Sequence, residues 1–401
     1  MEGREETRKA GQILIFTHFE GKRCFFSIID QKLHLAAFDT SESRDLGKIF
    51  VGKVRDVKPG LKAAFVEYKK GTNGFLPLSQ NELAAMKGDM RLPVQITKDA
   101  VKTKDAILSS ELSVTGLYCV ITNKPGGVTF SRKIPAKFRK SLDLLCTPFL
   151  PEGFTCIIRT NVLSLDEEDY SLLADEIVQS SAKLKHILQF QSSRTIYSEL
   201  YAGTSYVKKQ LAKINFSGVT QIITDSKEEL DQISQIIPRK LCGCLRLYED
   251  TAFPLAALYG LRAKLTEALD RTVWLKSGGY LVIEPTEALT VIDVNSGKNT
   301  RRLNKKQMIS LTNKEAAEAI PYILTSRNIT GIIIVDFISN DTVKEDEALL
   351  QLLRRQLLSD YVKADVVDIT PLGLVEITRQ KGEIPLKDQL NEVGLYGTFR
   401  H

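Results

Sequence analysis

Two apolar runs in the C-terminal part of the chain each lead into an aspartate. In TEALTVIDVNSG, residues 286–297, Asp293 and Asn295 are separated by one residue, so both side chains would project from the same face of a strand. In GIIIVDFISND, residues 331–341, a run without polar side chains leads directly into Asp336. Either ending alone is also typical of a strand running into a turn, because turns favour Asp, Asn, Ser and Gly. The repetition of the pattern favours a functional site.

The segment between the two runs predicts a helix. Apolar residues recur at roughly helical spacing within residues 305–324, so the unit reads as strand, helix, strand. Such a crossover joins parallel neighbours and would bring Asp293 and Asp336 to one edge of a sheet. The continuous Ile/Val run before Asp336 also indicates a strand buried on both faces, as in sheets covered by helices.

Two carboxylates at one sheet edge are suited to a hard cation. Magnesium prefers a few carboxylate oxygens and completes its shell with waters and substrate phosphate oxygens. Asp293 and Asp336 would supply the carboxylates, and Asn295 would orient a water or a carboxylate. The pattern therefore predicts metal-assisted phosphoryl chemistry.

Composition sets broad limits on the class of protein. The chain has 401 residues, 43% of them hydrophobic, which is enough for more than one buried core and excludes a tail or a fibre. Lys and Arg number 55 against 49 Asp and Glu, for a formal charge of +6. This excess is mild for a nucleic-acid binder, and it permits a polyanionic partner without establishing one.

The cysteines indicate reduced thiols. Only Cys242 and Cys244 are close in sequence, and no second pair or histidine cluster nearby completes four zinc ligands. We expect this pair to be buried, and we expect no structural zinc. The N-terminal apolar stretch is too short for a signal peptide, and no segment is long enough to span a membrane. A cytoplasmic protein without a membrane partner is therefore expected.

Short strands with alternating faces, separated by Gly and Pro turns, run from Gly47 to about Ser110. Closely spaced strands of this kind predict a small barrel, with the OB-fold as the candidate. Phe65 and Phe75 are of the type that stacks on bases, while lysines such as Lys104 hold phosphates. Ordinary barrel core is the alternative for either ring. Together these residues predict RNA binding.

The middle of the chain carries weaker signals. Arg159 and Thr160 follow a short apolar strand, as a phosphate-contacting pair does, although an Arg at a strand end is more often part of a surface ion pair. Helical segments alternate with a short strand over residues 171–270, without a catalytic signature. That region is predicted to be a scaffold.

The chain resembles the ribonuclease E/G family of endoribonucleases. The resemblance is densest at SGGYLVIEPTEALTVIDVNSG, NKEAAEAI and GIIIVDFI, continues through LGLVEITRQ, and includes AAFVEY and GFLPL in the barrel. It implies magnesium-dependent cleavage of single-stranded RNA in RNA processing or decay, favouring 5'-monophosphorylated ends. Manganese is the other candidate metal.

The fold that the resemblance implies is α/β and multidomain. An OB-fold β-barrel is inserted in a ribonuclease H-like subdomain, followed by a 5'-sensor subdomain and a deoxyribonuclease I-like α/β catalytic subdomain. The implied segments are the first ribonuclease H-like part (1–40), the RNA-binding barrel (41–110), the 5'-sensor region (111–198), the second ribonuclease H-like part (199–271), the catalytic subdomain (272–390) and a C-terminal tail (391–401).

The resemblance also assigns roles to residues that match the family's motifs. These roles are metal binding for Asp293 and Asp336, catalysis for the same pair with Asn295, RNA binding for Phe65, Phe75 and Lys104, and 5'-phosphate sensing for Arg159 and Thr160. After the Arg-Thr pair, RTNVLSL lacks the small residues and glycine of the family pattern. Near the C-terminus, RQKGEIPLKDQLNEVGLYGTFRH lacks the cysteine pair that shares zinc between subunits. Any homodimer is therefore expected to use contacts that do not need zinc.

Two other functions fit parts of the pattern. A catalytically inactive RNA-binding or ribosome-assembly factor on the same fold would have no need of the paired carboxylates. A hydrolase of small phosphoesters would have no need of the aromatic barrel. RNA bound equally well with and without magnesium, and never cut, would favour the first; failure of long single-stranded RNA to compete would favour the second.

Overall fold

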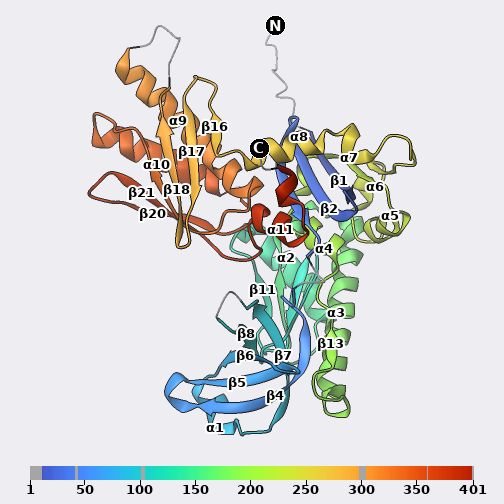
Figure 1. Cartoon of the computed structure of the whole chain (residues 1–401). Coiled ribbons are helices and arrows are strands. Elements are labelled where there is room, and N and C mark those ends of the chain that lie inside the picture. Colours follow the sequence, from blue (N-terminus) through green and yellow to red (C-terminus); the bar gives the residue numbers. More distant parts are fainter. Residues whose placement is uncertain (1–10, 41–43, 101–103, 298–303, 359, 400–401) are drawn as a thin grey trace. The chain divides into compact units, whose positions relative to one another are not determined.

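The computed structural model describes residues 11–40, 44–100, 104–297, 304–358 and 360–399. These residues form a mixed α/β protein built on several sheets (Figure 1). The chain divides into two compact units. The first comprises residues 1–40, 218–227 and 246–401, and the second comprises residues 41–217 and 228–245.

A five-stranded sheet begins the first unit, in the order β15-β14-β1-β2-β3. Its strands are β1 (Gln12–Phe19), β2 (Lys22–Ile29), β3 (Lys32–Phe38), β14 (Val219–Thr224) and β15 (Leu245–Leu247). The helices α7 (Leu255–Leu258), α8 (Leu261–Leu269) and α11 (Leu386–Glu392) share a buried apolar cluster with it. β14 runs parallel to β1, whereas β1, β2 and β3 are antiparallel.

The second sheet of the first unit has six strands, in the order β16-β17-β18-β19-β21-β20. The strands are β16 (Thr272–Trp274), β17 (Tyr280–Pro285), β18 (Leu289–Asn295), β19 (Gly331–Asp336), β20 (Ala364–Ile369) and β21 (Leu374–Arg379). Helix α9 (Lys305–Ser326) links β18 to its parallel neighbour β19, and α10 (Val343–Leu357) follows β19. The predicted strand–helix–strand unit is confirmed.

This six-stranded sheet buries only one face of β18 and β19. Ile292, Ile333 and Val335 join residues of α9 and α10 in one apolar core. On the opposite face, Ile334 is half-buried and Ile332 is 50% exposed. The prediction that the Ile/Val run is buried on both faces is wrong, because α9 and α10 pack on the same side as the core residues.

A small barrel begins the second unit. Its strands are β4 (Ile49–Lys58), β5 (Ala63–Lys69), β6 (Thr72–Pro77), β7 (Arg91–Lys98) and β8 (Ala106–Ser109). They are ordered β4-β5-β6-β8-β7, and pairing of β4 with β7 closes the barrel, while β13 (Glu199–Tyr201) adds to β4. All five strands lie between Gly47 and Ser110, the segment predicted to form a small barrel, so the five-stranded, OB-like barrel is confirmed.

A four-stranded sheet follows the barrel, in the order β11-β12-β10-β9. The elements of this region are β9 (Ser113–Thr115), β10 (Cys119–Thr122), β11 (Gly127–Phe130), α2 (Ala136–Cys146), β12 (Thr155–Ile158) and α3 (Tyr170–Phe190). The remaining helices are α1 (Gln80–Ala85) in the barrel, and α4 (Tyr206–Leu211), α5 (Lys227–Ser234) and α6 (Arg239–Cys242) after α3.

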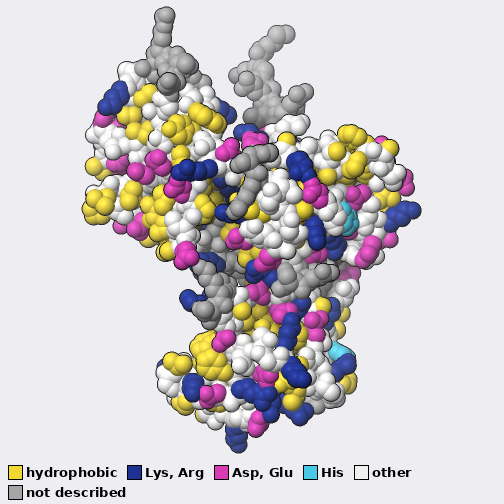
Figure 2. Space-filling model, viewed as in Figure 1, with side chains coloured by type: hydrophobic (Ala, Val, Ile, Leu, Met, Phe, Trp, Pro, Cys, Tyr) yellow, Lys and Arg dark blue, Asp and Glu magenta, His cyan; other side chains and the backbone are white. Residues whose placement is uncertain are grey.

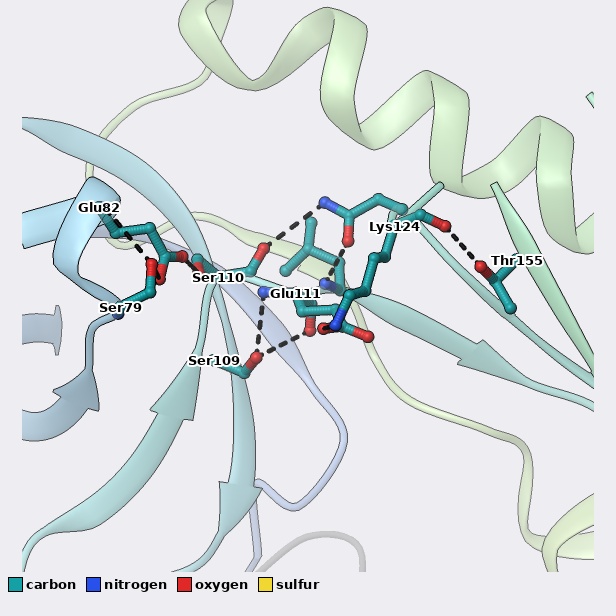
Figure 3. A network of polar contacts seen from close by, with 9 residues as sticks. Ser79, Glu82, Ser109, Ser110, Glu111, Lys124 and Thr155 are labelled. Atoms are coloured by element: carbon teal, nitrogen blue, oxygen red, sulfur yellow. Dashed lines mark hydrogen bonds and ion pairs between the residues drawn. The ribbon is translucent and has the colours of Figure 1, made fainter. Parts of the chain in front are cut away.

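Polar side chains join the barrel to the four-stranded sheet (Figure 3). Glu82, which caps α1 with Ser79, accepts a hydrogen bond from Ser110 Oγ at 2.7 Å. Glu111 forms an ion pair with Lys124 at 3.4 Å. The Lys124 carbonyl in turn accepts a hydrogen bond from Thr155 Oγ1 at 2.6 Å. These contacts connect helix α1 of the barrel, the segment after β8 and the four-stranded sheet.

Cys242 and Cys244 differ from the expectation that they are buried. Cys242 is exposed and Cys244 is half-buried, and both are free thiols. Cys242 is the last residue of α6, a one-turn helix that buries Leu241 instead. Among the described helices, none is long and apolar enough to cross a membrane.

Candidate active site

Asp293 and Asp336 lie side by side at the carboxyl ends of β18 and β19. The strands are parallel, and the two aspartates are register partners. Both side chains are exposed, because they alternate with Ile292, Val294 and Val335, which are buried against the helices. The predicted juxtaposition of the two carboxylates is therefore present, on the open face of the sheet.

Asn295 lies on the same strand and the same face as Asp293. Its Nδ2 donates a hydrogen bond to Asp293 Oδ2 at 2.8 Å. The Asn295 side chain is half-buried, so this bond holds the Asp293 carboxylate in one orientation. Two carboxylates and one amide thus gather at a single point of the sheet.

Glycines allow the turn between β16 and β17 to pack against the end of β18. Gly297 adopts a φ of +59°, and a Cβ there would lie 2.2 Å from the Gly278 carbonyl oxygen. A Cβ on Gly279 would lie 2.8 Å from the carbonyl oxygen of Asn295. Any larger residue at these positions would displace the backbone that carries Asn295.

The loop after Asp336 is held by Asn313, a buried residue of α9. Asn313 Nδ2 donates to the carbonyl of Ile338 at 2.7 Å and to Asn340 Oδ1 at 3.1 Å, while Asn313 Oδ1 accepts from Ile338 N at 3.1 Å. The side chain is only 2% exposed. Asn313 therefore fixes the backbone two residues beyond Asp336. Sequence reasoning missed it, although an amide on the apolar side of a helix needs such a partner.

Two acidic residues that follow Asp336 in the chain, Asp341 and Glu345, form ion pairs with a lysine of α9. Lys306, in the first turn of α9, forms ion pairs with Glu345 at 3.0 Å and with Asp341 at 3.7 Å. The hydrogen bond from Lys306 lowers the pKa of Glu345, and the pKa of Lys306 is raised in turn. Both acidic residues are therefore held in ion pairs that tie the start of α9 to the loop before α10 and to the first turn of α10.

The donor set of the Asp293–Asp336 site fits magnesium. Among the described residues, no group of three or more His, Cys, Asp or Glu side chains is placed to hold a metal. Magnesium needs no such group, since it binds through one or two carboxylates and keeps several waters. Zinc, by contrast, takes N and S ligands in closed structural sites. The two exposed aspartates suit a hydrated hard cation that also contacts a substrate phosphate.

Phe65 and Phe75 lie on the outer surface of the barrel. They are register partners on β5 and β6, and their rings meet edge to face with centroids 5.8 Å apart. Both are half-buried, and they alternate with the core residues Val66 and Leu76. Both rings therefore lie outside the barrel core, which was the alternative interpretation of these residues. Lys104 is exposed and precedes β8, the strand that pairs with β6 beside Phe75.

Arg159 lies in a more enclosed setting than a surface ion pair. Its Nη2 donates to the carbonyl of Ala212 at 3.2 Å, whereas its Nε is buried and has no hydrogen-bond partner among the described residues. Burial lowers the pKa of the Arg159 guanidinium, and the Glu176 carboxylate partly opposes this shift. Thr160 is half-buried directly after it. A buried N–H without a partner is costly, so a ligand anion would stabilise it.

Glu176 holds the backbone of the loop between β9 and β10, near Arg159. The carboxylate is 8% exposed and accepts backbone hydrogen bonds from Leu117 and Tyr118 at 2.6 Å each. A Cβ on Gly116 would lie 2.1 Å from this carboxylate, so only glycine fits there. The arrangement places a negative charge beside the guanidinium without a direct hydrogen bond to it.

Comparison with known proteins identifies relatives across most of the chain. Residues 113–382 match the ribonuclease E/G family. The chain is 32% identical over 355 residues to ribonuclease E of Nostoc sp., covering 84% of this chain and 51% of that protein. It is 31% identical over 359 residues to ribonuclease G of Haemophilus influenzae, covering 84% of this chain and 72% of that protein. The chain thus spans about half the length of the first relative and more of the second.

Proposed function

Since this chain belongs to the ribonuclease E/G family, we propose that it is a magnesium-dependent endoribonuclease that cleaves single-stranded RNA. The observation that carries the proposal is the pairing of Asp293 with Asp336 at adjacent strand ends, on the open face of the sheet. A packed core would have no use for these two exposed like charges, whereas a bound cation would neutralise them.

In this mechanism each residue of the site has a distinct task. Asp293 and Asp336 hold the cation, and Asn295 keeps the Asp293 carboxylate turned toward it. When bound, Mg²⁺ supplies a Lewis acid for the phosphate and lowers the pKa of water. The chain's own contribution is to fix two oxygen ligands on rigid strand ends and to leave the approach from solvent open. Mn²⁺ would substitute, because it accepts the same oxygen ligands.

The barrel would hold the RNA strand. Phe65 and Phe75 present ring surface outside the barrel core, and base stacking on such rings tolerates any sequence. Lys and Arg side chains gather over the barrel in Figure 2, where they can neutralise phosphates. Lys104 is one of the exposed lysines of this domain. Binding through these contacts should weaken steeply with salt.

We also propose that Arg159 and Thr160 bind the 5'-monophosphate of the substrate. The support is the buried Arg159 Nε, which has no partner among the described residues, with the Thr160 hydroxyl-bearing side chain next to it. Arg159→Lys keeps a charge but loses the planar fork, so it should lower the preference for 5'-monophosphorylated over 5'-triphosphorylated RNA. Arg139→Lys is the matched control, since Arg139 also donates to a backbone carbonyl, that of Ile134.

The assignment of subdomains completes the proposal. The β1–β3 sheet with β14 and α8 corresponds to the ribonuclease H-like part, and the four-stranded sheet with α3 corresponds to the 5'-sensor region. The six-stranded sheet with α9 and α10 corresponds to the deoxyribonuclease I-like catalytic part. A homodimer in this proposal uses contacts that do not need zinc, because Cys242 and Cys244 offer only half of a closed site.

One experiment tests the central proposal. Purified protein is incubated with 5'-monophosphorylated single-stranded RNA in Mg²⁺ or EDTA, and both binding and cleavage are measured. Cleavage in Mg²⁺ alone, lost in Asp293→Asn, supports the proposal. RNA that binds equally in both conditions and is never cut would instead favour an inactive RNA-binding or ribosome-assembly factor. Hydrolysis of small phosphoesters that RNA does not inhibit would favour a small-molecule hydrolase.

A further inference from the structure

Trp274 is the chain's single tryptophan, and 70% of its surface is exposed. It ends β16, where it is the register partner of Tyr280 on β17. The two rings lie with centroids 5.2 Å apart and planes inclined by 52°. An indole with so much surface in water is unusual, because aromatic side chains contribute most when buried.

This aromatic pair lies on the same sheet face as the paired carboxylates. Tyr280 is also the register partner of Asn295, and residues directly opposite in antiparallel strands point to the same side. Leu281, between Tyr280 and Val282, is buried on the helical side. Trp274, Tyr280 and Asn295 thus form a row across the open face. This row lies two residues along the strands from the row that contains Asp293 and Asp336.

Strand geometry gives the scale of this separation. With strands about 4.8 Å apart and about 3.3 Å per residue, the Tyr280 Cα lies roughly 8 Å from that of Asp293, and the Trp274 Cα lies roughly 12 Å from it. A nucleotide whose phosphate lies at the carboxylates would therefore place a neighbouring base over these rings.

The turn that carries Trp274 is held before any ligand binds. Leu275 N donates to the Gly279 carbonyl at 2.8 Å, and Gly278 N donates to the Leu275 carbonyl at 3.0 Å. Ser277 N donates to Glu315 Oε2, on α9, at 2.9 Å. The Leu275 side chain is buried in the core of the sheet. The platform is therefore rigid, which reduces the entropy cost of binding.

We propose that Trp274 and Tyr280 form a stacking platform for a base that flanks the scissile phosphate. This inference rests on the proposed function, since the Asp293–Asp336 site defines where the phosphate lies. A purely structural reading is that the pair only stabilises the hairpin, as cross-strand aromatic pairs do. That role requires contact between the rings but does not require the indole to face solvent on the side of the carboxylates.

The test uses Trp274 itself as the probe. Because the chain contains one tryptophan, its fluorescence reports on this ring alone. A short single-stranded oligoribonucleotide is titrated in Mg²⁺ into Asp293→Asn, which keeps the RNA intact. We expect saturable quenching with the same affinity that fluorescence anisotropy of the RNA gives. Binding seen by anisotropy with no change in tryptophan fluorescence would overturn the platform. Absence of RNA binding, together with absence of cleavage by the wild-type protein, would overturn both proposals.

Cleavage kinetics supply the second readout. Trp274→Ala should raise KM by roughly 5- to 150-fold, the range expected for one lost base-stacking contact, with kcat nearly unchanged. Trp274→Phe should restore most of the loss. Leu358→Ala is the matched control, since Leu358 is 72% exposed in the same unit and follows the C-terminal end of α10, at the opposite end of the sheet from the carboxylates. Equal KM for wild type and Trp274→Ala, with a lower melting temperature for the variant, would show that the pair only stabilises the hairpin.

The two proposals fail separately. Quenching without any cleavage by the wild-type protein would contradict the nuclease function and leave Trp274 as part of an RNA-binding surface only. Cleavage without quenching would support the nuclease function and contradict the stacking platform. Fluorescence that changes on dilution without RNA would show that a second copy of the chain covers Trp274, which also overturns the platform.

Discussion

Replacing Asp336 by asparagine should stabilise the metal-free protein while abolishing cleavage. Asp293 and Asp336 are register partners on adjacent parallel strands, so their carboxylates repel each other when no cation lies between them. Two unit charges about 5 Å apart interact by roughly 0.8 kcal/mol in water and by about 3 kcal/mol at an effective dielectric constant of 20. Because both side chains are exposed, the lower value applies, and the variant should gain about 1 kcal/mol.

Magnesium should have the opposite effect on the wild-type protein. A cation that binds only the folded state at ten times its Kd adds about 1.4 kcal/mol to the free energy of unfolding. For a unit of roughly 200 residues, 1 kcal/mol corresponds to about 2–4 °C in Tm. We therefore expect Mg²⁺ to raise the wild-type Tm by about 3–6 °C and to leave the variant unchanged. In EDTA, the variant should melt about 2–4 °C above the wild type.

Thermal melts in EDTA and in Mg²⁺, together with a cleavage assay, measure these effects. Asp365→Asn is the control, since Asp365 is exposed on β20 of the same sheet and pairs with Lys363 at 3.0 Å. It removes the same charge without touching the site. An Asp336→Asn protein that keeps its Mg²⁺-dependent rise in Tm and its cleavage would refute the assignment. A variant less stable than the wild type in EDTA would refute the argument from repulsion.

Three further predictions concern the barrel, the loop and the effect of pH. Phe65→Ala and Phe75→Ala should each weaken RNA binding by about 1–3 kcal/mol with little change in Tm; a lower Tm with unchanged affinity would contradict this. Asn313→Ala should cost about 2–4 kcal/mol in denaturant unfolding and reduce kcat, because it leaves the Ile338 N–H and carbonyl without their side-chain partner; unchanged stability and kcat would contradict this. Burial lowers the pKa of His34 below 6.5, so the unfolded chain takes up a proton first and stability should fall as pH drops below about 6.5; His34→Gln should reduce that fall between pH 7.5 and 5.5.

The sequence predicted elements whose signals are local. The five barrel strands all lie between Gly47 and Ser110, the segment whose short strands and Gly and Pro turns predicted a barrel. The crossover through α9 followed from helical spacing between two apolar runs, and a crossover of that kind makes its strands parallel. The meeting of Asp293 and Asp336 is a consequence of that topology. Their roles, with those of Asn295, remain predictions for the experiments above.

Other features depend on contacts that no single segment encodes. Asn313 is one residue of a long helix, and its importance appears only when the loop after Asp336 is seen to need its amide. Cys242 was expected to be buried because it lies in an apolar stretch, yet Leu241 takes the buried side of the single helical turn. Sequence shows which residues are apolar, but the side they face depends on what packs against them.

The incorrect prediction for β19 bears directly on function. A continuous Ile/Val run indicates burial on both faces only if helices cover both faces, and here α9 and α10 share one core on one side. Had both faces been covered, Asp293 and Asp336 would be two buried like charges, which is strongly unfavourable without a partner. With one face open, the same strand ends expose the carboxylates to a hydrated cation and an extended polymer. In the proposed mechanism, the one-sided sheet is therefore the feature that leaves the carboxylate pair open to a cation, and Trp274 is exposed on the same face.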